Sequence, residues 1–237
     1  MEEEKPVSEI KEVTKELVGW EDNKLWRTLK GLTLSPGATI RGFCGEDRQK
    51  YLSPITYFLG VTAVEAYVAS YFGLFEAMLD KNKEELKRAA TEPSLTRFFD
   101  TQQVSERVFD YLNFVTSETG QKVIFVPFVL LFTWLFYKKF NKSFKQNSWY
   151  ALYTLGHATL LAIPLIPIWY FSKDLVLYSN TGLAIIFIYS LWSSKQFYNL
   201  SLGKALVYQL LLDLTLLIAL NVLSFIVMTI AFASYLK

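Results

Sequence analysis

The sequence is poor in the residues that carry most catalytic and metal chemistry. Its 237 residues include one cysteine, Cys44, and one histidine, His157. A single cysteine excludes an internal disulfide and a cysteine-rich zinc site, and a single histidine excludes a His-x-x-x-His motif. Nucleotide-binding glycine loops and the HExxH and GxSxG motifs are also missing. We therefore expect no metal and no cofactor, and the sequence argues against an enzyme.

The chain also lacks an excess of charge of either sign. Lys and Arg number 24 against 22 for Asp and Glu, which gives a net charge of +2. A nucleic-acid-binding protein usually has a strong basic excess, so this class is excluded. Residues 1–5 are acidic, unlike the basic start of a secretory signal, so we expect the first transmembrane helix to direct insertion.

What the chain does contain is long apolar blocks, and these indicate a membrane protein. A helix needs about 20 apolar residues to cross a hydrocarbon core of about 30 Å. Five blocks meet or approach this length: 54–79, 123–137, 149–171, 175–192 and 205–235. The predicted fold is an all-α, polytopic bundle of five transmembrane helices at 54–237, preceded by cytoplasmic or interfacial amphipathic helices at 1–53. Pro127 weakens the second block, and Pro164 and Pro167 should kink the third.

The links between the blocks predict an orientation. The link at 138–145 carries four lysines and no acid, and the link around Lys195 and Lys204 also lacks acids. Basic links stay in the cytoplasm, so we expect the N-terminus inside and the C-terminus outside, in a bacterial inner membrane.

The segments outside the membrane show helical patterns. Residues 8–32 are typical of an amphipathic helix that packs on the bundle or lies on lipid, and Ser35-Pro36 marks a second helix start. Arg41, Arg48 and Lys50 are candidate contacts for anionic headgroups, or ordinary positive-inside anchors. The outer link at 80–121 should form a helical cap. A protein partner could bind the N-terminal helices or this link.

Ionisable residues inside the predicted spans are the strongest functional signal, because they are costly in lipid and usually face the bundle interior. Counting 1.5 Å per residue from the estimated span starts puts Glu65, His157 and Asp213 at similar depth. Gln209 and Asn180 could join this buried polar layer. The layer could be a structural hydrogen-bonded network, a proton or ion site, or a substrate site. Glu76 shares a face with Glu65 but lies near the span end, where an acid is often simply wet.

Several motifs resemble one family of bacterial membrane proteins. They are Thr28-Leu29-Lys30, Leu34-Ser35-Pro36-Gly37, Ile40-Arg41, Gly45, Arg48-x-x-Tyr51-x-x-Pro54, Val126-Pro127-Phe128, Leu155-Gly156-His157-Ala158 and Phe197-Tyr198-x-x-Ser201-x-x-Lys204. The family is catalogued as domain of unknown function 3667. The chain lacks the Cys-x-x-Cys zinc ribbon that many members carry, and has Leu155 where the family often has a first histidine. The resemblance implies an integral inner-membrane protein and brings no activity. The five-span layout is also similar to the Yip1 class, by analogy of layout only.

Two functions from different classes fit these observations. The first is a non-enzymatic scaffold or accessory subunit of the membrane. The second is a small transporter or channel that uses the Glu/His/Asp layer for protons, ions or a small solute. A lipid-directed membrane enzyme is a weaker third. Water access to the layer would distinguish a transporter from a scaffold.

Overall fold

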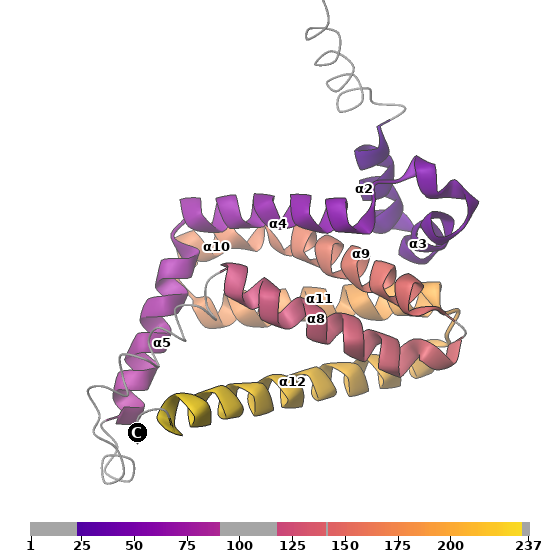
Figure 1. The fold of residues 1–237 in the computed structure, drawn as a ribbon. Helices are drawn as coiled ribbons and strands as arrows, with labels where there is room; N and C mark the ends of the chain where they lie inside the picture. Colours follow the sequence, from indigo (N-terminus) through magenta and orange to yellow (C-terminus); the bar gives the residue numbers. More distant parts are fainter. Residues whose placement is uncertain (1–22, 91–117, 141, 234–237) are drawn as a thin grey trace, which may run out of the picture.

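The computed structural model describes residues 23–90, 118–140 and 142–233. All regular structure in this part of the chain is helical, which confirms the all-α prediction (Figure 1). The α-helices are α2 (Lys24–Leu34), α3 (Pro36–Cys44), α4 (Pro54–Tyr71), α5 (Leu74–Ala90), α8 (Glu118–Tyr137), α9 (Phe144–Ala162), α10 (Leu165–Ser172), α11 (Leu175–Phe197) and α12 (Leu202–Ala233); η1 (Glu46–Lys50) and η2 (Lys138–Phe140) are short 3-10 helices.

Four stretches are long and apolar enough to cross a membrane. They are Glu46–Tyr71, Phe144–Ser172, Leu175–Phe197 and Leu202–Leu223. Helix α8 packs between α9 and α12, and its 20 residues run through Pro127 without a break. The chain thus has the helices of a polytopic membrane protein, and the count of five spans stays a prediction.

Local sequence sets the ends of the helices. Ser53 accepts a hydrogen bond from the Thr56 amide and Pro54 follows at the first position, so α4 begins there. It ends at Tyr71, because Gly73 has a φ of 71°, which glycine adopts without strain. The predicted block 54–79 is therefore divided between α4 and α5. The third block bends at Pro164, as predicted, where α9 gives way to α10.

The packing register shows which ends of the helices meet. Tyr57 of α4 lies level with His157 of α9, and Ala69 packs near Ile166, so α4 runs parallel to α9 and α10. His157 lies beside Tyr189, whereas Asn147 contacts Tyr198, so α11 runs antiparallel. The start of α9 and the end of α11 consequently share one end of the bundle, together with α2 and α3 (Figure 1).

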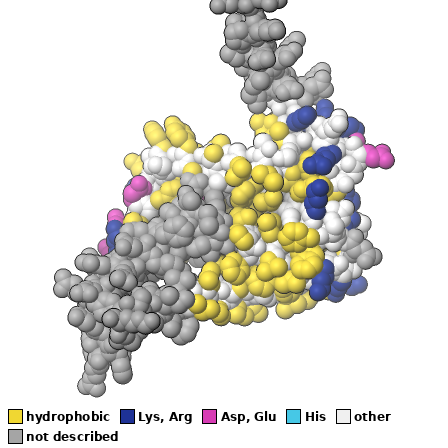
Figure 2. All heavy atoms as spheres, in the orientation of Figure 1, with side chains coloured by type: hydrophobic (Ala, Val, Ile, Leu, Met, Phe, Trp, Pro, Cys, Tyr) yellow, Lys and Arg dark blue, Asp and Glu magenta, His cyan; other side chains and the backbone are white. Residues whose placement is uncertain are grey.

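We call this the basic end, defined by α2, α3, η1, η2, the start of α9 and the end of α11. Lysine and arginine side chains gather along it, and apolar side chains cover the middle of the same face (Figure 2). The two basic links and the N-terminal segment lie on one side, as the sequence predicted. Which side of the membrane this is stays a prediction. Residues 1–22 and residues 91–117 of the predicted helical cap lie outside the described residues.

Candidate functional site

The only histidine lies buried where three distant segments meet. The ring Nδ1 lies 2.7 Å from the Tyr57 hydroxyl of α4, and Nε2 lies 3.1 Å from the Thr33 hydroxyl of α2. The Tyr189 ring of α11 packs against the imidazole at 5.0 Å. His157 has no solvent exposure. Both of its nitrogens are therefore occupied by hydroxyl groups, and the imidazole ties α2 and α4 to α9.

The second contact of the basic end joins α3 to the last turn of α11. The Gly37 amide donates to Gln196 Oε1 at 3.2 Å. Arg41 Nη1 donates to the backbone carbonyls of Gln196 and Phe197. The last carbonyls of a helix have no intrahelical partner and carry the negative end of its dipole. Arg41 thus satisfies and neutralises the C-terminus of α11.

Gly37 makes this contact close enough to exclude a side chain. A Cβ atom there would lie 2.4 Å from the Gln196 Cβ and 2.6 Å from the Phe197 amide nitrogen. The first of these atoms is fixed directly to the α11 backbone and the second is part of it, so neither can move aside without moving the helix. Glycine is needed here for close approach, since helical backbone by itself favours alanine.

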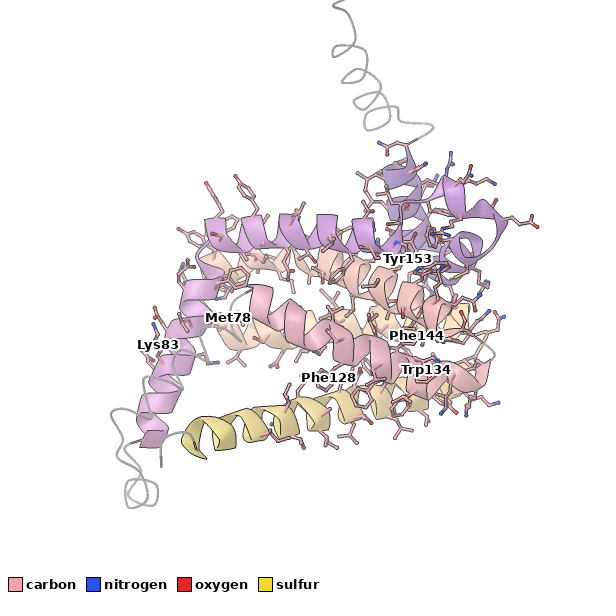
Figure 3. All side chains as sticks on the ribbon, viewed as in Figure 1. Met78, Lys83, Phe128, Trp134, Phe144 and Tyr153 are labelled. Atoms are coloured by element: carbon pink, nitrogen blue, oxygen red, sulfur yellow. The ribbon has the colours of Figure 1, made fainter. Side chains whose placement is uncertain are left out.

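A third set of contacts closes the turn between η1 and α4 onto α9. The Leu52 amide donates to the buried Thr28 hydroxyl at 3.0 Å, and the Leu52 carbonyl accepts from the Tyr153 hydroxyl. Tyr153 projects from α9 toward the N-terminal helices (Figure 3). The Tyr189 hydroxyl donates to the Leu32 carbonyl at 3.0 Å. Tyr153, Tyr189 and His157 of the bundle thus hold residues 28–57.

One face of α9 carries a polar stripe that binds α11. The Asn147 amide donates to the carbonyls of Lys142 and Ser143 and accepts from the Tyr198 hydroxyl at 2.6 Å. The Thr154 and Ser193 hydroxyls lie 3.1 Å apart. The side chains that make these contacts are all buried: Asn147, Tyr198, Thr154 and Ser193. Inside a membrane such groups need internal partners, and here they find them between neighbouring helices.

The cations of the basic end cover aromatic rings. Arg48 lies 5.2 Å from the Phe43 ring and 5.1 Å from the Trp149 ring. Lys142 and Lys145 lie over Phe197 and Trp149 in the same way. The charged groups thus lie at the outer surface of the basic end, and the faces of the aromatic rings lie beneath them.

The three predicted headgroup residues therefore have different surroundings. Arg41 is half-buried and turned into the protein, where its guanidinium donates to carbonyls at the end of α11. Arg48 is exposed over its two rings, and Lys50 is exposed in an ion pair with Asp47 at 2.6 Å. Headgroup binding by Arg48 and Lys50 stays a proposal.

The five residues of the predicted polar layer do not all meet in one place. The register that pairs Tyr57 with His157 puts Glu65 eight positions, about 12 Å, further along the bundle. Counting from estimated span starts missed this offset because α4 and α9 do not start level: Pro54 lies about level with Thr154, ten positions after Phe144. Glu65 is half-buried and lies near Tyr178. Asn180 is exposed on α11 rather than buried, and Glu76 is exposed in α5.

Gln209 and Asp213 do come together, one turn apart on α12. Gln209 Nε2 donates to Asp213 Oδ1 at 2.8 Å. The Tyr137 hydroxyl of α8 lies near both Ser194 and the Asp213 carboxylate. Tyr137 is fully buried and Gln209 nearly so. Within the described residues, neither the Tyr137 hydroxyl nor Gln209 Oε1 has a hydrogen-bond partner.

Sequence reasoning found His157 but missed its partners. Thr33 and Tyr57 are separated from it by 124 and 100 positions, and neither stands out among the hydroxyl residues of the chain. The one sequence signal for these two partners is their place beside motifs of the family resemblance. Thr33 directly precedes Leu34-Ser35-Pro36-Gly37, and Tyr57 follows Pro54 by three positions. No group of three or more His, Cys, Asp or Glu side chains that could hold a metal ion occurs in the described ranges.

Comparison with known proteins finds a similar family. Residues 22–64 match the model of a family described as a protein of unknown function, DUF3667. This stretch contains α2, α3, η1 and the first part of α4. Searches of the curated proteins and of the solved structures give no match. The chain thus resembles this family over the segment that carries the quoted motifs from Thr28 to Pro54, and the motifs further along the chain lie outside the match.

Proposed function

We propose that the protein is a non-enzymatic scaffold or accessory subunit of the bacterial inner membrane, with its basic end in the cytoplasm. One observation carries the proposal: the buried polar groups of the basic end serve to join helices. His157 bonds α2 and α4, Asn147 bonds Tyr198, and Arg41 caps α11. A proton-transfer or catalytic residue would need a free lone pair or proton facing a substrate. The His157 ring has both positions occupied.

The second support for a scaffold is a polar group on the outer, apolar face of α11. Asn180 is exposed six residues into this span, and its side-chain amide makes no hydrogen bond within the described part of the chain. Its neighbours at helical spacing, Val176, Leu177 and Leu183, are exposed apolar residues. An amide in lipid is costly, and a hydrogen bond to a polar group on another transmembrane helix removes that cost. We assign this face of α11 to a partner helix.

Site-specific photocrosslinking in intact cells tests the proposal. A benzophenone side chain replaces Leu183 of α11, and a matched variant carries it at Leu217, which is about equally exposed on α12. A scaffold with its partner on α11 gives a discrete protein adduct from position 183 and none from 217. Asn180→Leu should weaken the adduct, because the interhelical hydrogen bond is lost.

The contrary results are equally specific. Absence of a protein adduct from position 183, or equal adducts from both positions, contradicts a partner on α11. Solute or ion flux by the purified protein in liposomes, abolished by His157→Gln with the fold intact, favours the transporter alternative instead.

A further inference from the structure

The pair Gln209 and Asp213 lies well inside an apolar helix. Asp213 is eleven positions after Leu202 and twenty before Ala233 in α12. At 1.5 Å per residue, this places the carboxylate about 16 Å from the nearer end of the helix. Asp213 forms no ion pair with any lysine or arginine in the described ranges. A carboxylate at that depth needs a neutralising group.

The groups around Asp213 are oxygen atoms that lack donors. Gln209 Nε2 donates to Asp213 Oδ1, which leaves Gln209 Oε1 as a buried acceptor with no partner in the described part of the chain. The buried Tyr137 hydroxyl, equally unpartnered there, approaches from α8. A carboxylate, an amide oxygen and a hydroxyl oxygen thus lie near one another where α8 packs on α12.

This chemistry selects a small monovalent cation. Hard cations bind carboxylate, amide and hydroxyl oxygens. A divalent ion would leave a net positive charge beside one carboxylate in a low-dielectric span, whereas a monovalent ion leaves none. A bridging water would satisfy Gln209 and Tyr137 but would leave the charge of Asp213 in place.

We propose that Asp213, Gln209 and Tyr137 form a binding site for an alkali cation between α8 and α12. The site is independent of the scaffold function, because it shares no residue with the contacts of the basic end or with the outer face of α11. Binding of the cation joins α8 to α12, so occupancy stabilises the folded bundle through mass action.

The test measures thermal unfolding of the full chain in detergent at pH 7.5 and constant ionic strength. The reference salt is N-methylglucamine chloride, because N-methylglucamine is too large for the site. NaCl or KCl then replaces it stepwise. The unfolding midpoint of the wild type should rise saturably with one alkali ion. Asp213→Asn should abolish the rise. Tyr137→Phe should weaken the apparent affinity about tenfold, the loss expected from one hydroxyl ligand worth about 1.4 kcal/mol.

Thr215→Val is the matched control on the same helix. The Thr215 hydroxyl donates to the Leu211 carbonyl of its own helix, so this variant should keep the wild-type salt response. An unfolding midpoint of the wild type that is equal in all three salts overturns the proposal. So does a midpoint that depends on pH and on Asp213 but on no alkali ion, which makes the neutralising group a proton. If Asp213→Asn does not fold, an unchanged affinity in folded Tyr137→Phe also overturns it.

Discussion

Gly37→Ala tests the contact between α3 and the end of α11. The added Cβ would lie 2.4 Å from the Gln196 Cβ and 2.5 Å from the Gln196 carbonyl carbon. Carbon atoms in contact prefer about 3.5–4.0 Å, so α3 must move away by about 1 Å. We expect the variant to lose stability and to loosen the N-terminal segment from the bundle.

Three contributions set the expected loss in the free energy of unfolding of Gly37→Ala. Overpacking against a rigid neighbour costs about 1–3 kcal/mol. A shift of α3 also weakens the hydrogen bonds from Arg41 to the α11 carbonyls, and a hydrogen bond to a charged group contributes about 1.5–3 kcal/mol. The greater helix propensity of alanine offsets about 1 kcal/mol. The net loss should be about 3 kcal/mol.

Two assays follow this change in purified protein. The first is the thermal unfolding midpoint in detergent, and the second is the rate of trypsin cleavage after Arg41, which should rise as the guanidinium leaves α11. Gly182→Ala is the matched control, because a Cβ there meets nothing within 4 Å in the middle of α11. The control should melt at or slightly above the wild-type temperature. Equal melting and equal cleavage of Gly37→Ala and wild type would refute the packing of α3 on α11.

Three further predictions concern other parts of the basic end. His157→Phe should lower stability by about 1–3 kcal/mol, because the Tyr57 hydroxyl loses its buried partner; thermal unfolding measures this, and a further Tyr57→Phe change should add little. Burial raises the pKa of the Cys44 thiol to about 11 from 9.0, which leaves about a hundredfold less thiolate near neutral pH. Maleimide labelling of Cys44 in detergent should therefore be slow at pH 7.5 and speed up about tenfold per pH unit up to pH 10; a rate that levels off near pH 9 contradicts the raised pKa. In a Cys44→Ser background, a cysteine at exposed Gln49 should resist a membrane-impermeant thiol reagent in intact cells, whereas one at Asp80 should react; the reverse pattern contradicts the predicted orientation.

The sequence predicts the general architecture well, because that architecture follows from local patterns. Apolar blocks of about 20 residues predict the spanning helices, and acid-free links predict which ends of the bundle meet. Pro164 marks the bend between α9 and α10, and Pro36 marks the start of α3. Each of these signals resides within a few residues of the feature it predicts.

Contacts between segments are predicted less well, because they depend on register. Estimated span starts put Glu65 level with His157, but α4 starts level with a point about ten residues into α9, so Glu65 lies more than two turns beyond His157. The sequence makes Arg41 a candidate headgroup contact or a positive-inside anchor, whereas its guanidinium binds carbonyls at the end of α11, 155 positions away, which no residue near Arg41 indicates. Side-chain direction around a helix decides whether Asn180 is buried, and apolar residues on all sides of α11 do not reveal that direction.

Crosslinking between α3 and α11 tests most directly whether the N-terminal helices pack on the end of α11. In a Cys44→Ser background, cysteines replace exposed Ala38 and exposed Lys195, which neighbour the touching residues Gly37 and Gln196. A control pair joins position 38 to Lys173, at the other end of α11 and about 33 Å away along its axis. In native membranes, a bismaleimide with a reach of about 10 Å should join 38 to 195 within the chain and leave 38 and 173 unlinked. Failure to join 38 to 195, with both cysteines open to single labelling, would contradict the docking.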